Sequence, residues 1–392
     1  MSANIILGVT GGIAAYKSVQ IASDLTKLNH NVYTIMTESA AEFVSPLTFH
    51  SITHLPVESK LFSTTTSEVK HIGLADKADL FLVAPATANF IAKAAAGTAD
   101  DLLTTVLLAA QAPIMIAPSM NVHMFENPVV QRNLKTLDEL GYKIITPDSG
   151  YLACGYTGKG RLPAPKRFVE EVKRELAKKD LNNKKILITA GPTRESIDPV
   201  RFLTNHSSGK MGYALAKAAS YRGAEVKLIS GPSELETPLG VDLTKIETAK
   251  ELKEEVFNEF ENADIIIMAA AVSDYRPKEV SSQKIKKSDG NLELKLERTT
   301  DILAELGKMK KTSQLLIGFA AETENLLENA QQKLRKKQAD YIIANDISNK
   351  NIAFGSDKNQ VNILSKEGSV QLPLAEKEDL AHKIFDYILN KK

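Results

Sequence analysis

Polar residues gather where the apolar strands of the first half of the chain end. The turn "GVTGG" places Gly11 and Gly12 after the first strand, and "TESA" places Thr37 and Ser39 after the second. Free backbone amides at the start of a helix attract an anion, and the flanking hydroxyls suit a phosphate. The glycine spacing does not match G-x-G-x-x-G, which argues against a dinucleotide. Taken alone, these residues are equally compatible with ordinary turn chemistry.

Further reactive side chains flank the later strands of the same predicted sheet. "PATAN" supplies Thr87 and Asn89, "PSMN" supplies Asn121, and "EVKHIG" places His71 before the strand that leads to Thr87. The only cysteine, Cys154, follows in "GYLACGYTGKGR", where we expect neither helix nor strand but a mobile glycine loop. Because ligands of parallel sheets bind outside the carboxyl ends of the strands, these residues form a candidate site. A surface histidine and an incidental loop cysteine are the plainer alternatives.

The second half carries groups suited to binding phosphates. "SSGKMG" precedes an Ala-rich helix, so Ser207, Ser208 and nearby amides could hold a phosphate. The spacing is not that of a Walker A loop, and an N-capped helix is the alternative. Lysines also cluster in "KIKK", and two more recur at i and i+4 on one predicted helix face. Lysines in such a pattern usually form a charged surface exposed to solvent. These lysines are Lys284, Lys286, Lys287, Lys333 and Lys337.

Two sequence segments, one at the start of each half of the chain, have similar patterns and would form the elements that position these residues. Each has a short apolar strand, a Gly/Thr turn, an Ala-rich helix and a second β-branched strand, which together form a βαβ opening. Almost wholly apolar strands such as "ADLFLVAPA" and "ADIIIMAAA" indicate parallel sheets buried on both faces. The sequence therefore predicts an α/β protein with two doubly wound, mostly parallel-sheet, Rossmann-like domains, residues 1–181 and 182–392. The second domain would carry an added β-hairpin at "NQVNILSKEGSVQLPL".

Composition narrows the class of protein. The 392 residues carry a formal net charge of +1, so no overall field favours nucleic acid or a membrane surface. A single cysteine rules out an intrachain disulfide framework and fits a reducing cytosol. No apolar run approaches the roughly 18 residues that span a bilayer, and "MSANIILGVTGG" lacks the basic region of a signal peptide. We therefore expect a cytoplasmic protein that acts on small molecules.

The separated motifs together resemble known families. "GVTGGIAAYK", "APSMNVHMF" and "GYLACGYTGKGR" are similar to the flavin-dependent cysteine decarboxylases, whose fold is flavodoxin-like. "AGPTRE", "NHSSGKMG", "AAAVSDYRP", "KIKK", "GFAAET" and "ANDI" are similar to phosphopantothenate–cysteine ligase. Their fusion in this order resembles the bacterial bifunctional coenzyme A biosynthesis proteins over essentially the whole chain. Small departures are Thr87, Phe90 and Ser119, where the family more often has Ser, Thr and Ala.

The resemblance implies a chemistry for the first domain. It would bind FMN and convert 4'-phosphopantothenoylcysteine to 4'-phosphopantetheine, because oxidation of the substrate thiol by the flavin makes loss of the carboxylate easy. Cys154 matches the family's proton donor, His71 the residue essential to oxidative decarboxylation, and Asn121 the residue that holds the substrate carboxylate. The positions that match flavin contacts are Gly11, Gly12, Ile13, Thr37, Ser39, Thr87 and Asn89.

The resemblance also implies the reaction of the second domain. With CTP and Mg²⁺, the carboxylate of 4'-phosphopantothenate would be activated as an acyl-cytidylate, which the amine of cysteine then displaces to form an amide. Asn205 matches the residue that engages the acyl-cytidylate, and the family more often has Asn-Pro at Thr299 and Thr300. The positions that match CTP contacts are Asp274, Lys284, Thr299, Thr300, Asp301, Ile302, Phe319, Lys333 and Lys337.

Two other functions fit parts of the pattern. A flavin-binding regulatory subunit of the same fold is disfavoured, because His71, Asn121 and Cys154 are all present and the sequence has no long acidic tail. A nicotinamide oxidoreductase is disfavoured because neither half has the dinucleotide fingerprint. From the family we also expect a homo-oligomer, in which decarboxylase trimers are joined into a dodecamer through ligase dimers.

Overall fold

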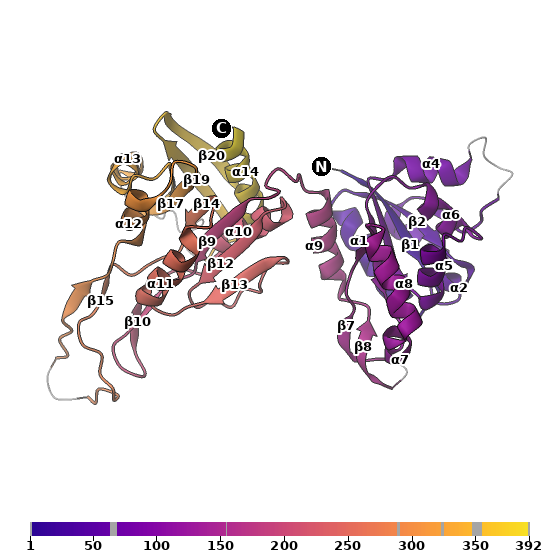
Figure 1. Cartoon of the computed structure of the whole chain (residues 1–392), viewed down its shortest axis with the longest axis horizontal. Helices are drawn as coiled ribbons and strands as arrows, with labels where there is room; N and C mark the ends of the chain where they lie inside the picture. Colours follow the sequence, from indigo (N-terminus) through magenta and orange to yellow (C-terminus); the bar gives the residue numbers. More distant parts are fainter. Residues whose placement is uncertain are drawn as a thin grey trace. The chain divides into compact units, whose positions relative to one another are not determined.

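The computed structural model describes residues 2–62, 69–153, 155–287, 291–322, 325–346 and 355–390. The chain divides into two compact units, Met1–Leu176 and Ala177–Lys392, each with its own core (Figure 1). The boundary that we place after residue 181 stays a prediction.

The sheet of unit 1 is parallel throughout its described strands. Its spatial order is β3 (Val57–Glu58), β2 (Asn31–Met36), β1 (Asn4–Val9), β4 (Leu80–Ala86), β5 (Ile114–Pro118) and β6 (Lys143–Ile144). The central strands β1 and β4 are apolar along nearly their whole length because helices cover both of their faces. The chain runs outward from β1 in one direction and from β4 in the other, so a switch point lies between these two strands.

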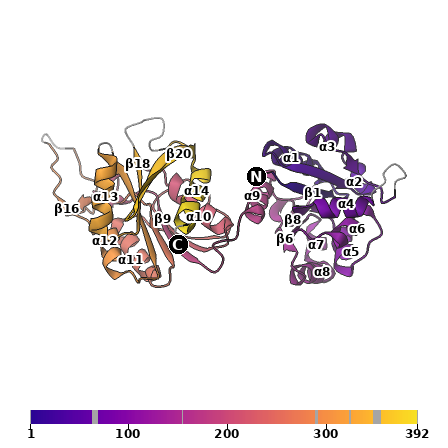
Figure 2. The same ribbon diagram turned by 90° about the horizontal axis from the view of Figure 1, so that it is seen from above.

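The helices of unit 1 form two layers around the sheet (Figure 2). Each helix buries one apolar stripe, as in α1, where Ile21 and Leu25 are fully buried. One core contains residues of α1 (Ala15–Lys27), α3 (Pro46–Thr53) and α9 (Pro165–Leu176). The core on the other face contains residues of α4 (Lys70–Lys77), α5 (Ala88–Ala96), α6 (Leu102–Ala109) and α8 (Pro128–Glu139).

The glycine-rich stretch around Cys154 corrects our expectation of an irregular loop. Strands β7 (Asp148–Tyr151) and β8 (Thr157–Arg161) pair as an antiparallel hairpin beside the short helix α7 (Val122–Glu126) (Figure 1). Strand pairing uses backbone groups, so glycines that lack a packing side chain can still take part when a neighbouring element supports them. Cys154 itself lies outside the described residues.

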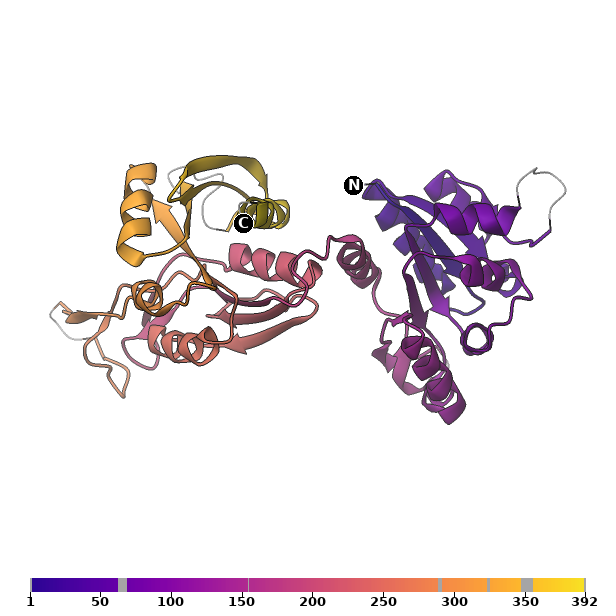
Figure 3. The same cartoon turned by 45° about the horizontal axis from the view of Figure 1, so that its top comes forward.

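Unit 2 has the same parallel order, extended by an antiparallel hairpin. The order is β13 (Val241–Lys245), β12 (Glu225–Ser230), β9 (Lys185–Ala190), β14 (Ile265–Met268), β17 (Leu315–Glu322), β18 (Tyr341–Asp346), β19 (Lys358–Ser365) and β20 (Gly368–Glu376). Strands β19 and β20 form the predicted hairpin, which lies beside the last helix (Figure 3). The prediction of two doubly wound α/β domains, the second with an added hairpin, is confirmed.

Helices cover both faces of this second sheet as well (Figure 2). Helices α10 (Lys210–Tyr221) and α14 (Lys377–Asn390) pack on one face, and α11 (Ala249–Phe260), α12 (Ile302–Met309) and α13 (Leu326–Lys337) pack on the other. Two small antiparallel pairs that the sequence did not reveal lie outside the main sheet. They are β10 (Arg194–Ser196) with β11 (Phe202–Thr204), and β15 (Tyr275–Pro277) with β16 (Leu296–Arg298). None of the described helices is long and apolar enough to cross a membrane.

Candidate functional site

Thr10 joins the two turns at the switch point of unit 1. Its buried hydroxyl donates to the carbonyl of Pro85 at 2.8 Å and accepts from the amide of Thr87 at 3.0 Å. The turn after β1 and the turn after β4 are therefore held side by side, where doubly wound sheets bind ligands. Thr10 is not among the residues predicted from the sequence, although it stands inside the "GVTGG" turn.

The predicted flavin residues meet around this junction. A Cβ on Gly11 would lie 2.3 Å from Cβ of Ser39, and a Cβ on Gly12 would lie 3.7 Å from Cγ2 of Thr87. The Thr87 hydroxyl caps α5 by accepting from the amide of Phe90 at 3.4 Å. The glycine turn, a serine and a capped helix start thus share one edge of the sheet, a setting that suits a phosphate.

The remaining predicted flavin residues lie close to these in the chain. Thr37 caps the short helix α2 (Glu38–Ala41), where its hydroxyl accepts from the amide of Ala40 at 3.2 Å. Asn89 is exposed in the first turn of α5. Ile13 is 60% exposed, which is unusual for an isoleucine next to a helix start and leaves an apolar surface beside the glycine turn.

Asn121 is positioned by helix α7 and by the β7–β8 hairpin. Its side-chain oxygen caps α7 by accepting from the amide of His123 at 2.8 Å. The preceding amide, of Met120, donates to the carbonyl of Gly160 in β8 at 3.0 Å. A Cβ on Gly158 would lie 2.5 Å from Cγ2 of Val122, so the glycines of β8 allow the hairpin to pack closely on the Asn121 turn. The hairpin that carries Cys154 therefore abuts Asn121.

His71 is placed less directly by the structure. It lies half-buried in the first turn of α4, the helix that leads into β4. Within the described part of unit 1, no hydrogen bond or ion pair links it to Thr87, Asn121 or the glycine turn. Its membership of the site stays a prediction, as does that of Cys154.

In unit 2, threonine hydroxyls tie together the turns that follow β9 and β14. The hydroxyl of Thr189 accepts from the amides of Ala269 and Ala270, each at 3.1 Å. The predicted residue Asn205, which directly follows β11, donates from Nδ2 to the carbonyl of Val272 at 3.0 Å. These bonds bring Asn205 to the carboxyl edge of the central strands, at the switch point of the second sheet.

Four of the predicted CTP residues converge next to this edge. The Thr299 amide donates to the carbonyl of Asp274 at 3.0 Å, and the Thr299 hydroxyl donates to the carbonyl of Ser273 at 2.6 Å. Asp301 caps α12 and forms an ion pair with Lys337 from α13. Burial lowers the pKa of Lys337, and the negative charge of Asp274 opposes that shift. A half-buried lysine beside two carboxylates can exchange those partners for a phosphate.

The other predicted CTP residues form a second group. Lys333 of α13 donates from Nζ to the carbonyl of Phe319 in β17 at 2.9 Å. Ile302, the first residue of α12, is buried, and Thr300 is exposed. Lys284 is exposed in the segment between β15 and β16. The contacts that fix the backbone of this segment could not be predicted from the sequence.

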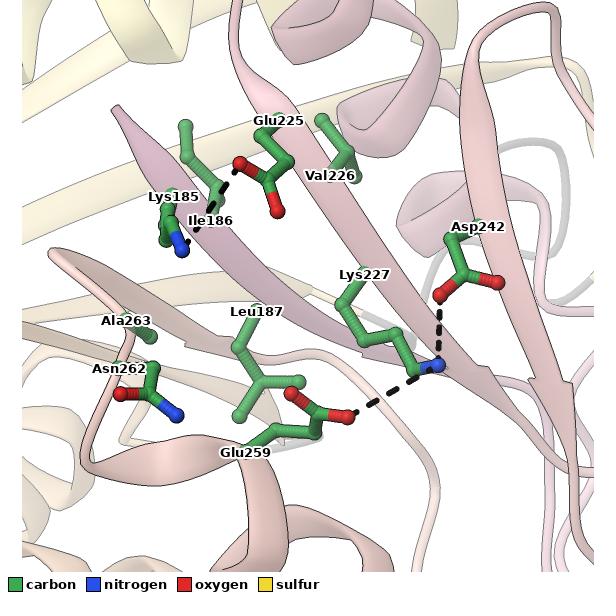
Figure 4. Close-up of a pocket in the computed structure, with 10 residues that line it drawn as sticks. All are labelled: Lys185, Ile186, Leu187, Glu225, Val226, Lys227, Asp242, Glu259, Asn262 and Ala263. Carbon is green, nitrogen blue, oxygen red and sulfur yellow. Dashed lines mark hydrogen bonds and ion pairs between the residues drawn. The ribbon is translucent and has the colours of Figure 1, made fainter. Parts of the chain in front are cut away.

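A small cavity of about 150 Å³ lies elsewhere in unit 2 (Figure 4). Lys185 and Glu225, which line it, are the first residues of β9 and β12, so the cavity lies at the amino ends of these strands. Lys227 in its wall pairs with Asp242 at 2.7 Å. No predicted site residue lines this cavity, and we do not assign it to the reaction. Among the described residues, no group of three or more His, Cys, Asp or Glu side chains could hold a metal ion.

Comparison with known proteins places both units in described families. Residues 1–177 match the family described as Flavoprotein, and residues 181–391 match the DNA/pantothenate metabolism flavoprotein C-terminal domain. The chain is 49% identical to the coenzyme A biosynthesis bifunctional protein CoaBC of Bacillus subtilis, over 98% of this chain and 96% of that one. It is 44% identical to the protein of the same name from Vibrio cholerae, over 98% and 97%. A crystal structure of the C-terminal domain of a CoaBC protein is 47% identical, with a TM-score of 0.47, and covers 55% of this chain and all of that one.

Proposed function

This chain belongs to the family of coenzyme A biosynthesis bifunctional proteins, and from that membership we propose how its residues divide the two reactions. The chain is an enzyme that carries out two consecutive steps of coenzyme A biosynthesis, a ligation that joins 4'-phosphopantothenate to cysteine and a decarboxylation of the product. We assign decarboxylation to residues 1–181 and ligation to residues 182–392. The regulatory-subunit alternative is not favoured, because the relatives span the whole chain and are named as biosynthetic proteins.

We propose that the flavin of unit 1 is FMN, held at the switch point between β1 and β4. Bound flavin supplies the oxidation that makes loss of the substrate carboxylate easy, and it later returns a hydride. The residues present fit its phosphate, because the open side of Gly12, the Thr87 hydroxyl and the first amides of α5 lie together. The residues proposed to hold it are Gly11, Gly12, Ile13, Thr37, Ser39, Thr87 and Asn89.

Three residues are proposed to act on the substrate of unit 1. The amide nitrogen of Asn121 can donate to the substrate carboxylate while its oxygen caps α7. His71 accepts or directs a proton during oxidation of the thiol. Cys154 supplies the final proton, and the hairpin that carries it excludes water from the site. The packing of β8 on the Asn121 turn supports a shared site for Asn121 and Cys154.

We propose that unit 2 activates its acid substrate with CTP. Lys337, Lys333 and Lys284 would offset the charge of the triphosphate, and Asn205 would engage the acyl-cytidylate. Asp274 and the Thr299–Ile302 segment would contact the nucleotide together with Phe319. This is supported by the bond from the Thr299 amide to the carbonyl of Asp274 and by the pairing of β14 with β17, the strand that carries Phe319. Mg²⁺ would be bound mainly through the phosphates, which needs no cluster of protein carboxylates.

Assembly and location complete the proposal. The exposed apolar side chains Ile13 and Tyr16, each 60% exposed beside the flavin turn, support contact with another copy of the chain. We propose a homo-oligomer of decarboxylase trimers joined by ligase dimers, located in the cytoplasm, with no nucleic acid or membrane partner. Light scattering of the purified protein tests the number of chains.

One observation supports the assignment: in each unit, predicted residues from separate turns meet at the carboxyl edge of that unit's own sheet. The test is to incubate the full chain with 4'-phosphopantothenate, cysteine, CTP and Mg²⁺ and to identify products by mass. We expect 4'-phosphopantothenoylcysteine and then 4'-phosphopantetheine, with pyrophosphate released only when CTP is present. Ligation that proceeds with ATP but not with CTP would overturn the nucleotide assignment. A colourless purified protein without flavin absorbance would overturn the FMN site.

A further inference from the structure

A buried carboxylate anchors the turn between β10 and β11. Asp198 is only 2% exposed, and it lies in the hairpin loop that joins these strands. Its Oδ1 accepts from the amides of Val200 and Arg201 at 2.8 and 2.9 Å. Its Oδ2 accepts from Nε and Nη2 of Arg201 at 3.0 and 2.5 Å. Hydrogen bonds from Arg201 hold the pKa of this carboxyl well below its usual range, so Asp198 is a fixed charge at neutral pH.

The same carboxylate reaches a segment far away in the sequence. Oδ2 of Asp198 also accepts from the amide of Ile285 at 3.1 Å, and Nη2 of Arg201 donates to the carbonyl of Ile285 at 2.9 Å. The amide of Ser281 donates to the carbonyl of Ile197 at 3.0 Å. Lys284 therefore stands between two tethers to one hairpin turn, in a stretch that has no helix or strand of its own.

The hairpin that provides these tethers also leads into the reaction site. Asn205 directly follows β11 and donates to the carbonyl of Val272, and β10 lies beside β15 (Figure 1). One small hairpin thus holds both the proposed acyl-cytidylate residue and the lysine segment. We propose that Asp198 is a positioning residue for ligation, which acts by fixing the backbone at Ile285 so that Lys284 is held for the nucleotide. This inference rests on the proposed role of Lys284 in binding CTP.

Asp198→Asn keeps the size of the side chain but replaces an acceptor that serves Arg201 and Ile285 with a donor or a neutral oxygen. We expect kcat/KM for CTP in ligation to fall about tenfold, mostly through KM, which corresponds to the loss of about one hydrogen bond to a charged group. KM for cysteine and decarboxylation of supplied 4'-phosphopantothenoylcysteine should stay unchanged. Exchange of the Ile285 amide with solvent should accelerate.

Asp242→Asn is the matched control. Asp242 is an acid of the same unit that pairs with Lys227 at 2.7 Å, but its side chain is 73% exposed and lines the cavity at the amino ends of the strands. The same chemical change should leave KM for CTP unaltered there. If both variants raise KM for CTP equally, the effect is a general loss of negative charge and the positioning role is wrong.

A double-mutant comparison separates this inference from the proposed function. If Asp198 acts through Lys284, Asp198→Asn combined with Lys284→Gln should be no worse than Lys284→Gln alone. Effects that multiply, or a normal KM for CTP in Asp198→Asn beside an impaired Lys284→Gln, would overturn the positioning role alone. Normal ligation in Lys284→Gln would overturn the nucleotide role of Lys284 and this inference with it. If Asp198→Asn fails to fold, Arg201→Lys removes the guanidinium group that bonds both Asp198 and the carbonyl of Ile285, and it should raise KM for CTP in the same way. An unchanged KM then contradicts the proposal.

Discussion

His71 lies in the first turn of α4, and its proposed role can be separated from folding. The ring is half-buried and is not part of the apolar core of unit 1, so replacing it with asparagine removes proton transfer without opening a cavity. We expect His71→Asn to bind flavin normally and to decarboxylate about 10²- to 10⁴-fold more slowly, the usual loss when a general acid or base is removed. Flavin absorbance and product mass measure the two properties. Decarboxylation at the wild-type rate would return His71 to the class of surface histidines.

Residues whose role is local could be predicted from the sequence, and residues whose role depends on a distant partner could not. Thr37 and Thr87 precede helices in the sequence, and both cap them. Thr10 and Asp198 matter because of contacts with Pro85 and Ile285, which lie 75 and 87 positions away. No spacing rule in one sequence identifies such a pairing, because it depends on which strands become neighbours.

At the scale of elements, the β7–β8 hairpin is a support for the Asn121 turn. Gly160 of β8 has φ +143°, and a Cβ there would lie 2.3 Å from the carbonyl oxygen of Met120. Gly160→Ala should therefore push the hairpin away from the Asn121 turn and lower decarboxylation, at a cost of roughly 1–3 kcal/mol in stability of unit 1, while ligation continues. The masses of the products measure decarboxylation and ligation separately, and thermal melting measures the stability of unit 1.

Gly97→Ala is the control for that change. Gly97 also has a positive φ, of +68°, but a Cβ there meets nothing within 4 Å. The control should lose stability through backbone strain and keep its decarboxylation rate. If both variants lose decarboxylation to the same degree, close packing of the hairpin is not what positions Asn121.

The elements themselves were predictable to different degrees. Strands such as β4 and β14 are continuous apolar runs, and hydrophobicity alone identified them. The β7–β8 hairpin was missed because its strands are short and rich in glycine, and they are held by backbone pairing and by α7. The β10–β11 pair was missed for a related reason, since three-residue strands carry no periodic pattern.

At the scale of a whole unit, Arg222 joins the two ends of unit 2. Its guanidinium contacts Asp180 at 2.5 Å and Asp386 at 2.8 Å, and it donates to the carbonyl of His382 at 3.0 Å. Hydrogen bonding from Arg222 lowers the pKa of Asp180 below its ordinary 3.8. The pair is therefore fully stabilising above that ordinary value, and its contribution is lost as the pH falls through the lower folded pKa.

Asp180→Asn should lower the free energy of unfolding of unit 2 at pH 7. The difference in this free energy between the variant and the wild type should shrink as the pH falls toward 3. Urea unfolding at several pH values, followed by a probe in unit 2, measures this. Lys185 and Glu225 form an exposed pair at 4.0 Å, so Glu225→Gln is a control that should show little effect at any pH. A difference between wild type and Asp180→Asn that grows on acidification would contradict the assigned sign.

The two units have separate hydrophobic cores, so each should unfold as its own cooperative transition. A ligand that binds one folded unit stabilises only that unit, by about 2.7 kcal/mol when its concentration is 100 times its Kd. After the flavin has been removed, adding FMN should raise the melting temperature of unit 1 alone, and CTP with Mg²⁺ should raise that of unit 2 alone. Calorimetry of the full chain measures both shifts. Arg222→Ala should lower the unit 2 transition and leave the FMN-sensitive one in place. A single transition that moves with either ligand would show that the two reactions share one cooperative structure.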